Sequence, residues 1–162
     1  MEAPVSGSRK PAEAVRPLLA PLCREAVPCG PVPNALSMKL ASNLFVGTVL
    51  TGLAEAMHHA AHQGLDLHQS ASILCAGPAS SDLLRMKAPK LVARDFAVQA
   101  SVAAVLDSHR MIAEAARAGG IAVPMLDACR ALFQETAGLG LEDADVVAVL
   151  RAIEARSGRG EG

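Results

Sequence analysis

Apolar and polar residues recur with a helical period over most of the chain after residue 33. Positions 39, 43, 46, 50, 53 and 57 are spaced as one face of a single helix, because residues three and four apart are neighbours on a helix surface. Asn34 is a suitable N-cap for this helix, and Gly64 is a suitable residue just beyond its end. The pattern therefore predicts one long helix of about 28 residues, which other helices must cover.

The same spacing, together with capping residues, predicts further helices over residues 66–75, 81–92, 98–118, 124–138 and 143–156. Residues 1–33 differ because they hold most of the prolines, and Pro17 and Pro21 should break any long helix there. In this segment we expect a helical turn or two within residues 18–26 and a short strand at residues 25–29. The sequence therefore divides the chain into three parts: an irregular or β-containing segment 1–33, a helical domain 34–156 and a disordered tail 157–162.

Composition narrows the fold class and the kinds of partner. The chain is 51% apolar and its three aromatic residues are all Phe, while the abundant Ala and Leu favour helices over sheets. We therefore expect an all-α helical bundle around one long central helix. A net charge of −1, with no basic stripe, argues against nucleic-acid binding. The longest uncharged apolar run, residues 40–54, is too short to span a membrane.

The cysteines and histidines suggest neither a disulfide framework nor a metal site. The four cysteines include no Cys-x-x-Cys pair, so we expect free, buried thiols in a reducing cytoplasm. His58 and His62 are spaced i, i+4, a geometry that can bind zinc, but no His-Glu-x-x-His pattern or acidic third ligand accompanies them. We interpret His58, His59 and His62 as a polar stretch of a half-exposed helix.

Lys39 and Asn43 occupy the first two positions of the long helical stripe, one turn apart, ahead of four apolar residues. In the simpler interpretation Lys39 reaches solvent and Asn43 caps a neighbouring backbone group. In the functional interpretation Lys39 is a general acid/base and Asn43 positions a substrate. The positive end of the helix dipole and partial burial would both destabilise the ammonium form of Lys39, which favours proton transfer.

Residues 34–156 resemble the all-helical C-terminal domain of the β-hydroxyacid dehydrogenase family, which includes 3-hydroxyisobutyrate dehydrogenases. The resemblance rests on the motifs MKLASN, GLAEAMHHAAHQGLD, EAARAGGIAVPM and GLGLEDADVVAV. It implies the fold of the 6-phosphogluconate dehydrogenase C-terminal domain. It also implies that Lys39 is the catalytic acid/base, that Asn43 contacts the substrate, that NAD or NADP is the cofactor and that the domain forms a homodimer.

The segment EAPVSGS resembles the family's DAPVSGG loop, which implies that Ser6 and Gly7 bind the substrate carboxylate, with Ser8 where Gly is usual. Residues 1–33 would then be the remnant of the end of a dinucleotide-binding domain. The sequence also departs from the family. It contains no Gly-x-Gly-x-x-Gly motif, and Leu106-Asp107 stands where the family has a second lysine. The cofactor-binding residues therefore stay unassigned.

Three interpretations of function remain open. The first is an NAD(P)-dependent oxidoreductase that acts on a small β-hydroxyacid or its semialdehyde and is incomplete without a cofactor domain. The second is a non-catalytic helical dimerisation module derived from that family, and the third is a truncated gene product. Imine reductases share the fold but usually replace the catalytic lysine, so Lys39 favours the hydroxyacid branch.

Overall fold

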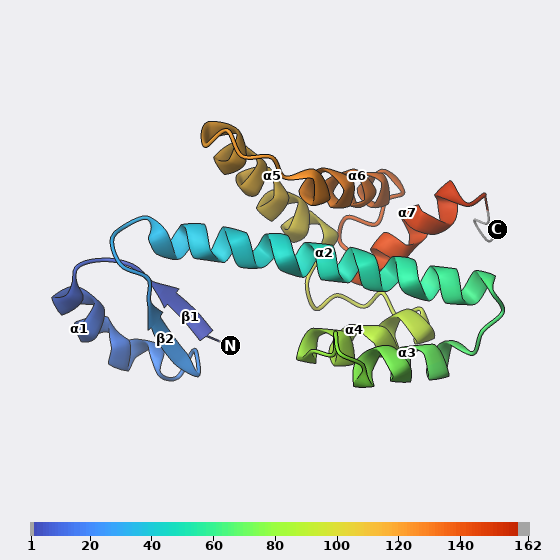
Figure 1. The fold of residues 1–162 in the computed structure, drawn as a ribbon, viewed down its shortest axis with the longest axis horizontal. Helices are drawn as coiled ribbons and strands as arrows, with labels where there is room; N and C mark the ends of the chain where they lie inside the picture. Colours follow the sequence, from blue (N-terminus) through green and yellow to red (C-terminus); the bar gives the residue numbers. More distant parts are fainter. Residues whose placement is uncertain (1, 159–162) are drawn as a thin grey trace. The chain divides into compact units, whose positions relative to one another are not determined.

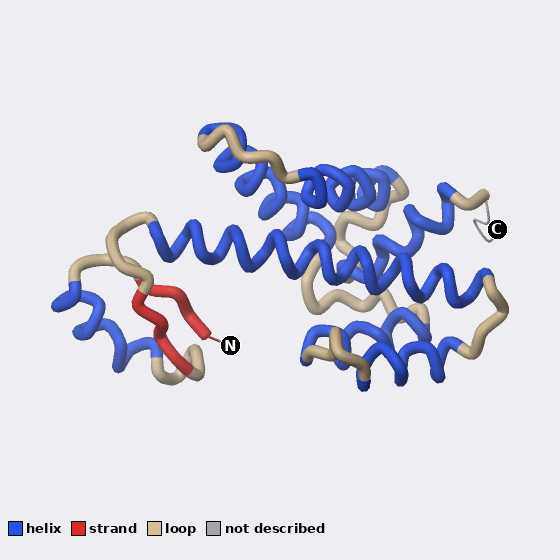
Figure 2. Tube along the Cα trace, viewed as in Figure 1, coloured by secondary structure: helices blue, strands red, loops and turns tan. Residues whose placement is uncertain are grey.

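The computed structural model describes residues 2–158, which form seven α-helices, one short 3-10 helix and one pair of strands (Figures 1 and 2). The chain divides into two compact units, with the boundary between Leu44 and Phe45, inside the long helix α2. The predicted helical bundle is confirmed for the second unit, and the first unit contains the strands.

The first unit begins with a strand–helix–strand arrangement. Strand β1 (Glu2–Val5) pairs in parallel with β2 (Glu25–Pro28), and helix α1 (Arg9–Leu19) connects them. The strand predicted at residues 25–29 is confirmed, whereas β1 was not predicted because a four-residue strand shows no period of its own. As expected, α1 is not a long helix, since it has 11 residues, but the helical turns expected within residues 18–26 were placed too late in the chain. Pro17 lies in the last turn of α1, and the helix ends two residues later.

Helix α2 (Asn34–His62) confirms the long helix, with 29 residues. Asn34 is the first residue of the helix, and its side-chain Nδ2 donates to the carbonyl of Cys29 at 2.8 Å. Gly64 follows the helix with a φ of +70°, which few other residues adopt. The most apolar 18-residue window of α2 has a mean hydropathy of 1.3, enough to cross a membrane by length and composition alone. Core helices of soluble proteins pass the same test, so this is weak support for a membrane span.

The remaining helices follow the predicted order. Asp66 caps α3 (Leu67–Ala76), as expected, and Ser81, the predicted first residue of the next helix, caps α4 (Asp82–Ala93). Helix α6 (Pro124–Gly138) has the predicted bounds. Helix α5 (Val102–Ala118), however, begins four residues later than predicted, at a cap supplied by Ser101.

The last predicted helix, residues 143–156, is also shorter than expected. Asp145, not Asp143, caps the 3-10 helix η1 (Val146–Ala148), and α7 (Val149–Arg156) follows directly. Of the predicted disordered tail, residues 159–162 lie outside the described residues. Ser157 is described, and its hydroxyl lies 2.8 Å from Nε2 of His58.

The core of the second unit lies where α2 meets two helical pairs. Helices α3 and α4 pack side by side, as do α5 and α6, and the C-terminal half of α2 runs between these pairs (Figure 1). Leu50, Leu53 and Met57 on α2 are buried, which confirms the predicted apolar face, while Val46 is half-buried. They pack with buried residues of the later helices, including Leu84, Leu91, Leu132, Phe133, Val149 and Ile153.

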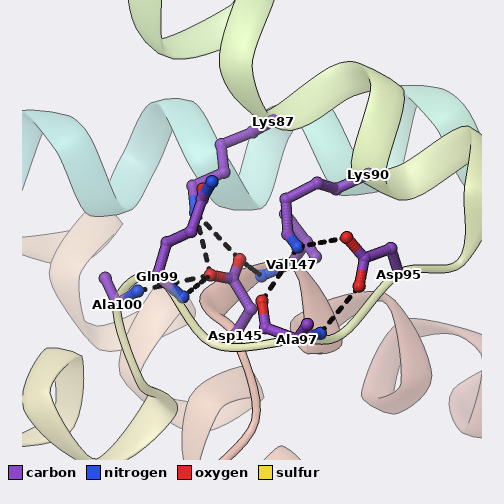
Figure 3. Close-up of polar contacts among 8 residues, drawn as sticks. All are labelled: Lys87, Lys90, Asp95, Ala97, Gln99, Ala100, Asp145 and Val147. Atoms are coloured by element: carbon purple, nitrogen blue, oxygen red, sulfur yellow. Dashed lines mark hydrogen bonds and ion pairs between the residues drawn. The ribbon is translucent and has the colours of Figure 1, made fainter.

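An ion pair is also buried in this core. Lys87 of α4 is 3% exposed, and its Nζ donates to both carboxylate oxygens of Asp145 at 2.9 Å and to Oε1 of Gln99 at 2.9 Å (Figure 3). Asp145 is fully buried and also accepts from the backbone N–H groups of Gln99, Ala100 and Val147. Burial raises the pKa of Asp145, but these hydrogen bonds outweigh it and hold the pKa below its usual value.

This network explains the late start of α5. Residues 94–101 form a loop that is hydrogen-bonded to α4. Lys90 Nζ of this helix donates to the carboxylate of Asp95 at 2.6 Å and to the carbonyl of Ala97 at 2.8 Å (Figure 3). Val102 then donates its backbone N–H to Ala144, and Ala103 donates to Glu142. These contacts hold the chain in a non-helical path until Ser101.

Candidate functional site

Lys39 and Asn43 lie in the first turns of α2, on the same face and one turn apart, as the spacing predicts. Asn43 is half-buried and Lys39 is exposed. The expected partial burial of Lys39 was wrong. The apolar part of the stripe begins only at Val46, and Leu36, one turn before Lys39, is itself 53% exposed.

The loop after β1 carries Ser6 and Gly7, both half-buried. Gly7 has a φ of +146°, which side-chain-bearing residues rarely adopt, and its N–H donates to the carbonyl of Gly30 at 2.9 Å. Ser8 precedes α1 in an extended conformation and makes no capping hydrogen bond with its side chain. The first N–H groups of α1 therefore lack a side-chain acceptor at the N-cap, and such groups can bind a carboxylate.

The loop and the start of α2 belong to one hydrogen-bonded structure. Cys29 donates its N–H to the carbonyl of Val5 at 2.8 Å, which extends the strand pairing toward Gly7. Asn34 then holds the carbonyl of Cys29 through its side chain, so the segment between β2 and α2 is fixed at both ends. All four predicted site residues, Ser6, Gly7, Lys39 and Asn43, belong to the first unit.

The histidines form no metal site in the part of the chain that the structure describes, where no three potential ligands are grouped. The rings of His58 and His62 lie 4.2 Å apart beside an open cavity of about 470 Å³. None of the four cysteines forms a disulfide, as predicted, but only Cys129 is buried, while the other three thiols are half-buried.

Sequence reasoning missed one unusual residue of the second unit. His109 lies between two polar residues, Asp107 and Arg110, and was given no role, but it is 1% exposed. Its spacing could have shown this, because the buried Val102, Ile112 and Ala116 lie seven before it and three and seven after it on α5. Asp107 and Arg110 do lie on the surface, 4.0 Å apart.

Comparison with solved structures defines the class of the fold. It matches the crystal structure of 3-hydroxyisobutyrate dehydrogenase from Salmonella typhimurium with a TM-score of 0.83 at 21% identity, over 90% of this chain and 51% of that one. The helical bundle is therefore the fold found in part of an oxidoreductase.

The family follows from the sequence match. The family model described as the NAD-binding domain of NADP-dependent 3-hydroxyisobutyrate dehydrogenase matches residues 34–153, and the chain belongs to this family. Glyoxylate/succinic semialdehyde reductase 2 of Arabidopsis thaliana, a chloroplastic protein, is 26% identical over 98% of the chain. The 2-hydroxy-3-oxopropionate reductase of Escherichia coli is 25% identical over 93% of it. The chain spans about half the length of these relatives, 49% and 51%.

Proposed function

We propose that this chain supplies the substrate side of an NAD(P)-dependent reductase of small aldehyde acids, which also oxidises the corresponding hydroxyacids, β-hydroxyacids among them. The family match over residues 34–153 carries the proposal, because it includes Lys39 and Asn43 at the start of α2. The relatives' names support the substrate class, since glyoxylate, succinic semialdehyde and 2-hydroxy-3-oxopropionate each pair an aldehyde with a carboxylate.

Each of the four residues has a role in this proposal. The N–H groups at the start of α1 and the hydroxyl of Ser6 bind the substrate carboxylate, while Gly7 allows the backbone to turn there. Asn43 orients the carbonyl group. Reduction of an aldehyde adds a hydride at carbon and a proton at oxygen, and we assign the proton to the ammonium of Lys39. In the reverse direction, neutral Lys39 takes the proton from the hydroxyl.

The cofactor of the family is NAD or NADP, which supplies or accepts the hydride. The turn between β1 and α1 does not fit the pyrophosphate of a dinucleotide. The β1–α1 turn has a single glycine, Gly7, and the sequence contains no Gly-x-Gly-x-x-Gly motif to approach a pyrophosphate. In this proposal a dinucleotide-binding domain outside the described residues holds the cofactor.

The carboxylate role of Ser6 can be tested in a chimaera in which the dinucleotide-binding half of the Arabidopsis thaliana reductase precedes this chain. We expect Ser6→Ala to raise KM for succinic semialdehyde about 10- to 100-fold, because a hydrogen bond to a charged group is lost. Steady-state kinetics with NADPH measure this effect. Ser8→Ala, which removes an exposed hydroxyl from the same loop, is the matched control. Equal KM values for the two variants would remove Ser6 from the site.

A dimerisation module is the second candidate function. Phe45 on α2 is 68% exposed, and Gly52 and Ala56 on the same helical face are also exposed. No charged residue occurs between Lys39 and Glu55, so this uncharged stretch of surface can pack against a second copy of the chain. A homodimer is compatible with the reductase proposal, and a cytoplasmic location remains part of that proposal.

We expect the wild-type chain to be a dimer at micromolar concentration and Phe45→Glu to be a monomer, because a charge would be desolvated at the interface. Light scattering coupled to size-exclusion chromatography measures the mass of both. Leu65→Glu, at a residue that is 56% exposed beyond the end of α2, is the control and should leave the dimer intact. A monomeric wild-type chain would exclude the dimerisation module.

A further inference from the structure

His109 is packed between two other helices in the middle of α5. The rings of His109 and Phe133 of α6 meet edge to face, with centroids 5.5 Å apart. On the other side lies Gly47 of α2, where an added Cβ would come within 2.6 Å of Nε2 of His109. Glycine at position 47 therefore lets the imidazole rest directly on the backbone of α2.

The hydrogen bonding of His109 favours the neutral imidazole. Its Nδ1 is buried and has no hydrogen-bond partner within residues 2–158. A neutral imidazole can leave one nitrogen as an unpaired acceptor, whereas the imidazolium has two N–H donors and a charge. Protonation would therefore place a positive charge and an unpaired donor in the core, which is costly.

The charges around His109 do not offset this cost. Helix α2 carries no charged residue between Lys39 and Glu55, so the face of α2 at Gly47 offers no counterion. Arg130 on α6 opposes a second positive charge. The acidic groups of α5 and α6 and the one before η1 are paired with other cations or exposed. Asp107 and Glu114 pair with Arg110, Glu135 pairs with Arg156, Asp145 pairs with Lys87, and Asp127 is exposed.

We propose that His109 makes the packing of α5 and α6 against α2 sensitive to pH, closed when the imidazole is neutral and loosened when it is protonated. The burial of His109, and then the charge of Arg130, lower the pKa of its imidazole below the usual value. The unfolded or opened state, with an ordinary pKa of about 6.5, then binds the proton more tightly. The stabilising effect is complete above about pH 6.5 and is lost as the pH falls through the lowered pKa.

Two measurements on the 162-residue chain test this proposal. NMR titration of the histidine Cε1–H signals should give His109 a pKa below the ordinary histidine value of about 6.5. Hydrogen exchange, corrected for the intrinsic effect of pH, should show that amides of residues 45–57 and 102–116 lose protection between pH 7.5 and pH 5.5, by at most about tenfold, which is the limit for a group whose pKa in the opened state is about 6.5.

Variants separate this effect from general acid sensitivity. His109→Gln cannot take a proton and should abolish this loss of protection, whereas the wild type and His68→Gln should both show it. If His109→Gln does not fold, His109→Phe keeps a ring against Phe133 and serves the same purpose. The proposal is overturned if the pKa of His109 is not below the ordinary histidine value of about 6.5, or if a non-titrating variant loses protection on acidification as much as the wild type does.

Discussion

Lys39→Met should lower kcat for NADPH-dependent reduction of succinic semialdehyde by about 10²- to 10⁴-fold in the chimaera described above, the usual contribution of a general acid. Methionine keeps the length of the side chain but has no proton to donate. Lys39 is exposed, so the substitution costs the fold little, and circular dichroism should show an unchanged melting curve. KM should change much less than kcat, because the proton is transferred only in the transition state.

Substitutions at two other residues of α2 are compared with Lys39→Met. Ser42→Ala removes an exposed hydroxyl next to Asn43 and should leave both constants unchanged. Asn43→Ala should mainly raise KM, since this residue orients the substrate rather than transferring a proton. A Lys39→Met chimaera with wild-type kcat would show that another group supplies the proton.

Lys87→Met should lower the free energy of unfolding by about 3–5 kcal/mol, the typical cost of leaving one member of a buried ion pair without its partner. Methionine fills most of the volume of the lysine side chain, so the loss comes from the charge of Asp145 rather than from a cavity. Asp145 is fully buried and would keep only its backbone N–H donors. Urea unfolding monitored by circular dichroism measures the change.

The pH dependence distinguishes this cause from loss of packing. In the wild type the lowered pKa of Asp145 contributes stability that is complete above its unfolded pKa of about 3.9 and is lost as the pH falls further. In Lys87→Met a protonated Asp145 no longer needs a cation, so the difference between variant and wild type should narrow below pH 4. Arg85→Gln, in the exposed pair with Asp82, should cost at most about 0.5 kcal/mol. A loss below 1 kcal/mol for Lys87→Met would contradict the importance of the buried pair.

The helices of the second unit could be predicted because each combines a periodic apolar face with a local cap. Asp66 and Ser81 cap α3 and α4 through contacts two to three residues away, and these are visible in the sequence. The late start of α5 and the cap at Asp145 were missed because they depend on Lys87, a residue 58 positions away from Asp145 along the chain. A contact between side chains so far apart in the sequence produces no periodic pattern of apolar residues from which it could be predicted.

In the candidate site, too, features set by the local sequence could be predicted, whereas features set by distant contacts could not. The spacing of Lys39 and Asn43 placed them on one face of α2, and the motifs singled out Ser6 and Gly7. The exposure of Lys39 could not be predicted, because burial depends on which elements cover the first turns of α2. Strand β1 was missed for a related reason, since its four residues are held by pairing with β2 rather than by their own propensity.

The most direct measurement is NMR titration of the unmodified 162-residue chain with 3-hydroxypropionate, a small β-hydroxyacid, against 1,3-propanediol, which lacks the carboxylate. We expect the acid to shift the backbone amide signals of Ser6, Gly7 and Asn43 in a saturable manner, and the diol to leave them unchanged. The shift at Ser6 should disappear in Ser6→Ala. Absence of saturable shifts at these residues, or the same shifts with the diol, would contradict the claim that this chain holds the substrate side of the reductase.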